Sequence, residues 1–264
     1  MNDIITSTQN PKIKRMMILQ QKSAERKKEG IFIVEGCQEI NHCIHNKLQI
    51  VTLYYCKALW DQDYSSLLSQ AAQSVEVTEK VYEKMAYRGS TEGLIATVRT
   101  RQRSLDDLQL SESPLIIVLE KVEKPGNLGA ILRSADAAHA DAVIVCDPLT
   151  DLYNPNIIRS SVGAVFTVPC VTCSSEECIH YLKKKHIQIL TAQLQDSRLY
   201  YDTDMKKATA IVMGTESTGL TTIWRQAADA HIRIPMLGQI DSLNVSVSTA
   251  ILVFEAVRQR QSVR

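Results

Sequence analysis

The chain has 264 residues, of which 45% are apolar, enough for one large or two small hydrophobic cores. Its 30 Lys and Arg side chains nearly balance 29 Asp and Glu side chains, so the net charge of +1 favours no class of partner, and any nucleic-acid contact must be local. The sequence has no run of about 18 apolar residues to span a membrane and no apolar signal segment, so we expect a cytoplasmic protein without a membrane partner. The seven cysteines, an odd number, are expected to be reduced thiols.

Basic side chains gather near the N-terminus, where residues 11–29 hold seven Lys or Arg and two Glu. Asn10 is a suitable N-cap and Pro11 fits the first helical position, so one basic amphipathic helix is predicted. A solvated helix surface and an RNA or phosphate contact explain this charge pattern equally well. In the second interpretation, the contacting side chains are Lys12, Lys14, Arg26, Lys27 and Lys28.

Residues 1–100 alternate between apolar runs and helical patterns, which indicates a small α/β domain. The predicted strands span 31–36, 49–56 and 93–99, and the predicted helices span 38–47, 62–72 and 79–87. Residues 101–113 are polar and end before Pro114, so they are predicted to form a linker.

Residues 114–264 carry short apolar runs rich in Val and Ile, separated by helical stretches. Such runs are typical of a parallel sheet that is covered by helices on both faces. The predicted strands span 114–120, 142–147, 164–169, 187–192, 210–214 and 231–235.

The stretch 120–147 resembles a dinucleotide-binding unit in outline, because Asp147 follows a loop with Gly126 and Gly129 by about 20 residues. Only two of the three glycines of that fingerprint are present, however. Arg133 also lies one helical turn after Gly129 and brings a permanent cation, which suits a phosphate of the substrate. Dinucleotide binding is therefore the weaker interpretation.

Two further stretches place polar residues next to apolar ones. Residues 212–220 run from an apolar strand into a loop with Glu216, and either a ligand loop or an ordinary strand-to-helix connection fits them. The last apolar helix begins with more polar side chains than the single one that capping requires. The surplus predicts a polar pocket at the N-terminus of that helix. Its members are Ser242, Asn244, Ser246 and Ser248.

In this order, the segments 127–136, 213–220 and 234–256 resemble the motifs of the SpoU (TrmH-type) RNA ribose 2′-O-methyltransferases of the SPOUT class. The N-terminal part is similar to the ribosomal-protein-like RNA-binding domain of these enzymes, although Glu92-Gly93 stands where relatives often have Gln-Gly. The resemblance implies an α/β fold with a trefoil-knotted parallel-sheet methyltransferase domain over 114–264 and a smaller α/β substrate-binding domain over 1–100.

The resemblance also implies a cofactor, a partner and site residues. S-adenosylmethionine would be held by Gly214, Ile234 and Leu243, with Thr191 and Ala192 as additions, and the C-terminal domain would form a homodimer. Arg133 would act on the target hydroxyl, and we interpret it as an electrostatic stabiliser because arginine does not lose its proton. Asn127, Ser242 and Asn244 would donate hydrogen bonds, and Glu216 would orient the arginine or the nearby backbone. Arg159 would lie near the RNA, or be an ordinary surface residue.

The expected function is 2′-O-methylation of RNA, and ribosomal RNA is favoured over transfer RNA because the appended domain is commoner among ribosomal enzymes. A binding module that keeps the fold without catalysis is the alternative from another class. An antibiotic-resistance methylase would share the same site residues.

A zinc site is a competing interpretation of the sequence near residue 175. Cys170, Cys173, Cys178 and His180 have a spacing that suits four zinc ligands. Ser174 and Glu177 form a capping-box pattern, however, which places Cys178 and His180 two positions apart on one helix and therefore on different faces. We therefore predict buried thiols and no metal ion.

Overall fold

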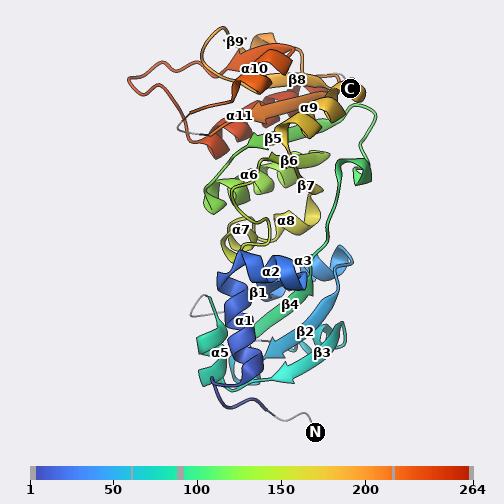
Figure 1. Ribbon diagram of the computed structural model, residues 1–264, viewed down its shortest axis with the longest axis vertical. Helices are drawn as coiled ribbons and strands as arrows, with labels where there is room; N and C mark the ends of the chain where they lie inside the picture. The colour runs from blue at the N-terminus through green and yellow to red at the C-terminus, as the bar shows by residue number, and fades with distance from the viewer. Residues whose placement is uncertain (1–3, 61, 88–91, 216–217, 262–264) are drawn as a thin grey trace. The chain divides into compact units, whose positions relative to one another are not determined.

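The structure is a computed structural model that describes residues 4–60, 62–87, 92–215 and 218–261 (Figure 1). The chain packs as two compact units. The first unit comprises residues 1–101 and 151–166, and the second comprises residues 102–150 and 167–264. The domain boundaries drawn from the sequence stay a prediction. No helix within the described ranges is long and apolar enough to cross a membrane.

The first unit is built on a four-stranded sheet in the order β1-β4-β2-β3. β1 and β2 are antiparallel to β4, and β2 is parallel to β3. The strands β1, β2 and β4 match the three predicted strands. This unit includes the helices α1, α2, α3, α4 and α5. The bounds are β1 (Ile31–Glu35), β2 (Ile50–Tyr55), β3 (Ala71–Glu76), β4 (Leu94–Arg99), α1 (Pro11–Gln21), α2 (Ser23–Glu29), α3 (Cys37–His45) and α5 (Glu79–Met85), with the 3-10 helix η1 (Lys57–Leu59).

The prediction of a helix over 62–72 is wrong. Only α4 (Ser65–Leu68) is helical there, and the strand β3 follows at once. β3 lies at the edge of the sheet and most of its residues are partly or fully exposed. Because an edge strand with one exposed face needs few apolar residues, its sequence lacks the alternation that would mark it.

Residues 11–29 form two helices instead of the one predicted. Lys22 is extended between α1 and α2 (φ −113°, ψ 108°). The break lets Arg26 donate hydrogen bonds to the carbonyls of Leu19 and Gln20, close to the end of α1. The last carbonyls of a helix have no hydrogen-bond partner within that helix. The break after α1 leaves the carbonyls of Leu19 and Gln20 in this position, and Arg26 provides their hydrogen bonds.

The second unit is built on a seven-stranded sheet in the order β7-β6-β5-β10-β8-β11-β9, in which all neighbours are parallel. The predicted parallel sheet is therefore confirmed. The strands are β5 (Leu115–Glu120), β6 (Ala142–Cys146), β7 (Cys170–Cys173), β8 (Gln188–Ala192), β9 (Arg198–Leu199), β10 (Thr209–Met213) and β11 (Ala230–Arg233).

The predicted strand over 164–169 is wrong, because the chain forms a helical turn, α8 (Ala164–Thr167), before β7 begins. Gly163 precedes that turn with a φ of +80°, a conformation that glycine adopts without strain. Phe166 then stacks on Phe32 within the first unit, at a centroid distance of 5.7 Å. The apolar run thus fills a core as a turn of helix and not as a strand.

Helices cover both faces of the seven-stranded sheet. α9 (Ser175–Lys184) and α10 (Thr222–Ala227) bury Leu182 and Trp224 against one face, together with strand residues such as Val118. Side chains alternate along each strand, so the other face is left for α6 (Pro125–Ala137) and α11 (Val245–Gln261), which pack against each other. The trefoil knot that the resemblance implies stays a prediction.

The end of α11 is bound to two other segments of the second unit. Arg260 donates hydrogen bonds to the carbonyls of Ser113, Pro114, Met205 and Lys207. Gln259 adds a bond to the carbonyl of Thr203 and accepts one from the backbone of Met205. Partial burial lowers the pKa of Arg260, although an arginine stays charged at any pH of interest. The helix end is thereby joined to the start of β5 and to the loop before β10.

Candidate functional site

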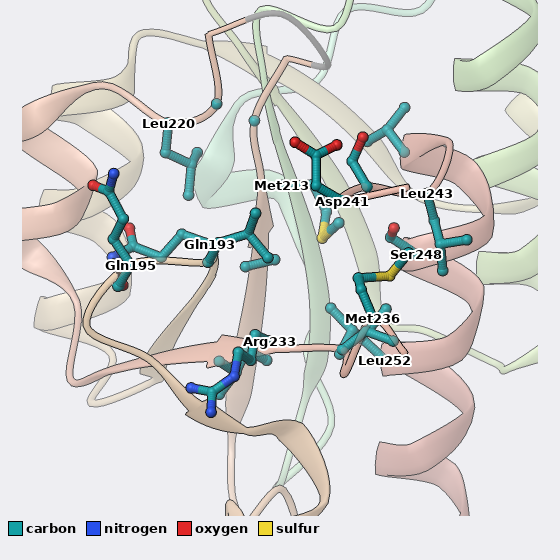
Figure 2. Close-up of a pocket in the computed structure, with 18 of the residues that line it drawn as sticks. Gln193, Gln195, Met213, Leu220, Arg233, Met236, Asp241, Leu243, Ser248 and Leu252 are labelled. Atoms are coloured by element: carbon teal, nitrogen blue, oxygen red, sulfur yellow. Dashed lines mark hydrogen bonds between the residues drawn. The ribbon is translucent and has the colours of Figure 1, made fainter. Parts of the chain in front are cut away.

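A cavity of about 330 Å³ lies at the carboxyl ends of β8, β10 and β11 (Figure 2). In sheets of parallel strands, this edge is where ligands bind, because loops and helix N-termini converge there. Gln193, Leu220 and Asp241 come from three different loops and gather around the same space in Figure 2. The walls also include Ala192, Gln193, Gln195, Met213, Gly214, Ile232, Ile234, Met236, Ser242, Ser248 and Leu252.

The loop after β10 forms one wall and depends on Gly214. A Cβ atom on Gly214 would lie 2.4 Å from the carbonyl carbon of Gly219, so no other residue fits without moving the backbone. The Gly219 amide donates to the Thr215 carbonyl at 3.0 Å, which closes the turn. Glu216, predicted here as a catalytic residue, lies outside the described residues.

A buried carboxylate fixes the far end of this loop. Glu120 is 1% exposed at the end of β5 and accepts hydrogen bonds from the backbone and the hydroxyl of Thr221, at 2.8 and 2.5 Å. Thr221 is the N-cap of α10, so the pair ties the start of that helix to the sheet. Sequence reasoning missed Glu120, although an acid closing an otherwise apolar strand was a usable signal.

The polar cluster before α11 serves two purposes. Asn244 acts as a cap, since its Oδ1 accepts hydrogen bonds from the backbone and the hydroxyl of Ser246 at 2.9 and 2.6 Å. Ser242 and Ser248 line the cavity instead. Capping therefore explains part of the cluster, and a pocket wall explains the surplus.

Asn127 and Asn244 join two of the three sequence motifs. The Asn244 side-chain amide donates to Oδ1 of Asn127 at 3.1 Å, across 117 positions in the sequence. A second cavity of about 140 Å³ adjoins this pair. It shares Gly214, Thr215 and Val245 with the larger cavity. Its other walls are Val122, Glu123, Lys124 and Asn127, of which sequence reasoning named only the last.

Two of the predicted site residues lie apart from these cavities. Arg133 is exposed on α6, six residues or about 9 Å along the helix from Asn127, and has no hydrogen bond or ion pair with any residue that the structure describes. Thr191 is fully buried in β8, and its hydroxyl lies 2.6 Å from Nδ1 of His231. Its neighbour Ala192 does line the larger cavity.

The residues predicted to bind RNA divide into two groups. Lys12, Lys14, Lys27 and Lys28 are exposed on α1 and α2, and Arg159 is exposed on α7 (Pro155–Ser160). Arg26 is only 3% exposed and forms a 2.7 Å ion pair with Asp151 inside the first unit. Because its guanidinium already holds a carboxylate and two carbonyls, we remove Arg26 from the RNA surface.

The segment 120–147 does not have the geometry of a dinucleotide site. Gly129 is buried within α6 instead of approaching a ligand from a loop. Asp147 accepts a hydrogen bond from the Ser175 hydroxyl at 2.7 Å, so its carboxylate is engaged at the start of α9.

A profile of the SpoU rRNA Methylase family matches residues 114–254, which is 141 of the 264 residues. The chain belongs to the SpoU rRNA methylase family. A profile of the MRM3-like substrate binding domain matches residues 10–96 of this SpoU protein. The resemblance drawn from the three motifs and the basic N-terminal segment is thereby confirmed.

Relatives of this SpoU protein extend over nearly its whole length. It is 34% identical over 244 residues to the 23S rRNA (guanosine-2′-O-)-methyltransferase RlmB of Shewanella oneidensis, covering 88% of this chain and 97% of that protein. It is 27% identical to the 23S rRNA (uridine(2479)-2′-O)-methyltransferase of Streptomyces viridochromogenes, covering 98% and 93%. The crystal structure of an AdoMet-bound rRNA methyltransferase from Sinorhizobium meliloti superposes with a TM-score of 0.90 at 29% identity, covering 97% of each chain.

Proposed function

We propose that this protein transfers a methyl group from S-adenosylmethionine to a ribose 2′-hydroxyl of ribosomal RNA. The observation that carries the proposal is the pair of adjoining cavities, which share Gly214, Thr215 and Val245 as a common wall. Two reactants must meet in such a transfer, and holding both in one geometry supplies a large part of the rate. The relatives named above support ribosomal RNA, and the RlmB relative makes a guanosine of 23S RNA the first nucleotide to test.

The larger cavity suits the methyl donor. Its volume is within the range of about 300–1,000 Å³ that is usual for small-molecule sites. Gly214, Ile234 and Leu243 would hold the cofactor largely through backbone groups, and glycine at position 214 allows the loop backbone to pass this closely along the wall. Ala192 and Ser242 complete this wall. When bound, the cofactor supplies an electrophilic methyl group on sulfonium.

The side chains of the smaller cavity would position the ribose. The hydrogen bond from the Asn244 side-chain amide to Oδ1 of Asn127 fixes the orientation of both side chains beside this cavity. Arg133 keeps its proton and stabilises the negative charge that develops on the 2′-oxygen, which excludes it as the proton acceptor. Glu216 stays in the proposal as an orienting residue, and Thr191 as a backbone contact.

We propose further that the active form is a homodimer in which Arg133 serves the site of the other subunit. Two features support this: Arg133 has no partner among the described residues of its own chain, and α11 presents apolar side chains to solvent. Val247 and Phe254 are 47% and 45% exposed and seven positions apart, hence on one face of α11. An exposed apolar face of this kind marks an interaction surface.

The test is methyl transfer from labelled S-adenosylmethionine to 23S RNA lacking 2′-O-methyl groups, with transfer RNA as the competing substrate. We expect label in 23S RNA, lost in Arg133→Ala and partly kept in Arg133→Lys. Label found only in transfer RNA would show that the substrate is transfer RNA and not ribosomal RNA. Calorimetric binding of the methyl donor without any transfer would favour the binding module, and binding of NADH would revive the dinucleotide interpretation.

A further inference from the structure

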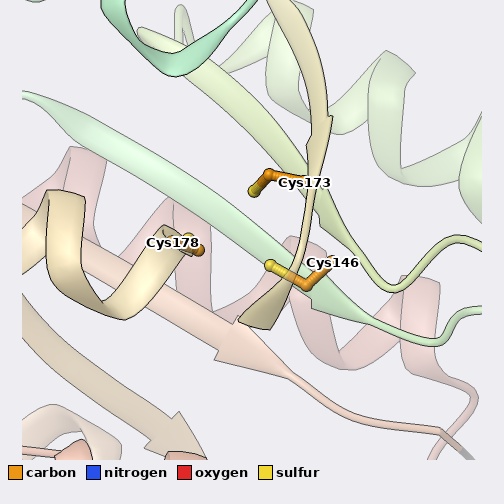
Figure 3. Close-up of side chains that lie close together, drawn as sticks. All are labelled: Cys146, Cys173 and Cys178. Carbon is orange, nitrogen blue, oxygen red and sulfur yellow. The ribbon is translucent and has the colours of Figure 1, made fainter. Parts of the chain in front are cut away.

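A cluster of three thiols lies in the second unit, outside the cavities described above. The sulfur atoms of Cys146, Cys173 and Cys178 all lie within 4.8 Å of one another. Figure 3 shows them reaching toward a common space from two strands and a helix. The C-x2-C-x4-C-x-H spacing offers another set of ligands, with Cys170 and His180, for which the sequence predicts buried thiols and no metal ion. Cys146, which is distant in sequence, takes part in their place.

Each thiol is held by a well-fixed element. Cys146 ends β6 and is paired in register with Cys173 at the end of β7. The amide of Asp147 donates to the Cys173 carbonyl at 2.9 Å, which holds the strand ends together. Cys178 lies in the first turns of α9, whose start is fixed by the predicted capping box of Ser174 and Glu177. Metal sites bind tightly when their ligands are preset on strands and helices in this way.

The spacing of the sulfurs suits coordination of one ion. Thiolates bound to zinc at about 2.3 Å lie about 3.8 Å apart in a tetrahedral site, so an adjustment of about 1 Å or less brings three sulfurs within 4.8 Å to one ion. Cys146 and Cys178 are fully buried, whereas Cys173 is half-buried and gives access from solvent.

The ligand set limits the choice of ion. Three soft sulfur ligands select thiophilic ions such as Zn²⁺ and Cu⁺ over hard cations such as Mg²⁺. No fourth His, Cys, Asp or Glu joins the cluster within the described residues. Zinc would therefore take a water molecule as its fourth ligand on the Cys173 side, whereas Cu⁺ is satisfied by three thiolates.

We propose that Cys146, Cys173 and Cys178 bind a thiophilic metal ion, Zn²⁺ or Cu⁺, as three thiolate ligands. Binding replaces the S–H bonds with metal–sulfur bonds and releases the protons to solvent, without an oxidant or reductant. The ion would join α9 to the ends of β6 and β7. This position is independent of the proposed catalytic function, because none of the three residues lines a cavity of the site.

The experiment uses the full chain, purified under reducing conditions and stripped of metal with a chelator. Cd²⁺ is the probe, because cadmium–thiolate bonds absorb in the ultraviolet, and Zn²⁺ and Cu⁺ are then added as competitors. We expect one Cd²⁺ per chain, displaced by the ion that the site prefers. Cys173→Ser, a change at a half-buried position, should weaken binding by at least about 100-fold. Cys170→Ser, on the same strand but outside the cluster, should bind as the unaltered chain does.

A second readout separates binding from misfolding. Zn²⁺ or Cu⁺ should raise the melting temperature of the unaltered chain and of Cys170→Ser, but not that of Cys173→Ser, since only binding to the native state stabilises it. Equal cadmium binding by Cys173→Ser and the unaltered chain would overturn the proposal. So would a reduced protein that takes up no cadmium, or one in which mild oxidation joins two of the three thiols and no metal is bound.

Discussion

Gly214 is the residue on which the proposed cofactor wall depends most directly. Gly214→Ala would place a methyl group 2.4 Å from the backbone of Gly219, and backbone cannot move aside as a flexible side chain can. Overpacking of this kind costs about 1–3 kcal/mol, so we expect a lower free energy of unfolding in urea and weaker binding of S-adenosylmethionine in calorimetry.

Gly126 offers a matched control for that change. A Cβ atom there meets nothing within 4 Å, and Gly126 lies in the first turn of α6. Gly126→Ala should leave the affinity for the methyl donor unchanged and alter the free energy of unfolding by less than about 1 kcal/mol. If both variants bound the donor equally well, Gly214 would not be part of the cofactor wall.

At the scale of elements, α2 carries a buried arginine, Arg26, that stabilises the fold, next to two exposed lysines, Lys27 and Lys28, that are available to bind RNA. Asp151→Ala would leave the buried charge of Arg26 without its carboxylate, and breaking such a pair costs about 3–5 kcal/mol. Lys27→Ala with Lys28→Ala should instead leave the urea midpoint unchanged, because both side chains are exposed, and should weaken RNA binding more strongly at low salt than at high salt. Urea melts of both variants measure the change in stability, and filter binding at two salt concentrations measures the RNA affinity. An RNA affinity that does not depend on the salt concentration would contradict the proposed role of Lys27 and Lys28.

The end of α11 permits a comparison of two neighbouring arginines. Arg260→Ala removes hydrogen bonds to four carbonyls, and we expect a loss of about 1–3 kcal/mol in the free energy of unfolding. The Arg258 side chain is 63% exposed and pairs with Glu255 of its own helix, so Arg258→Ala should lower the free energy of unfolding much less than Arg260→Ala does. Chemical denaturation measures both, and equal losses would mean that the Arg260 bonds add no net stability.

The sequence was informative where local pattern decides the structure. Buried strands, the cap at Asn10 and the capping box at Ser174 follow from composition and spacing within a few residues. It was uninformative where distant segments decide. The charge pattern of α2 does not distinguish buried Arg26 from exposed Lys27, because Asp151 lies 125 positions away. The Asn127–Asn244 bond and the pairing of Cys146 with Cys173 depend in the same way on the order of the strands in the sheet.

At the scale of the whole molecule, the proposed dimer makes a prediction about mixtures. If Arg133 serves the site of the other subunit, Arg133→Ala and Asn127→Ala are each inactive alone, but a mixed dimer keeps one intact site. Random pairing of equal amounts would restore about a quarter of the unaltered activity. Co-expression followed by the methyl-transfer assay measures this, and a mixture as inactive as its components would show that Arg133 acts within its own chain.

The segment 151–166 has a consequence for how this protein could be divided or recombined. It follows the first strands of the second unit along the chain, yet Asp151 neutralises Arg26 and Tyr153 stacks on Phe32 in the first unit, at 4.2 Å between ring centroids. A gene fragment that ends within residues 101–113 would therefore encode a first unit with an unpaired buried charge and an uncovered aromatic ring. The first unit therefore needs residues 151–166, which lie within the methylase part of the sequence. An exchange of the first unit between relatives must transfer residues 1–101 and 151–166 together.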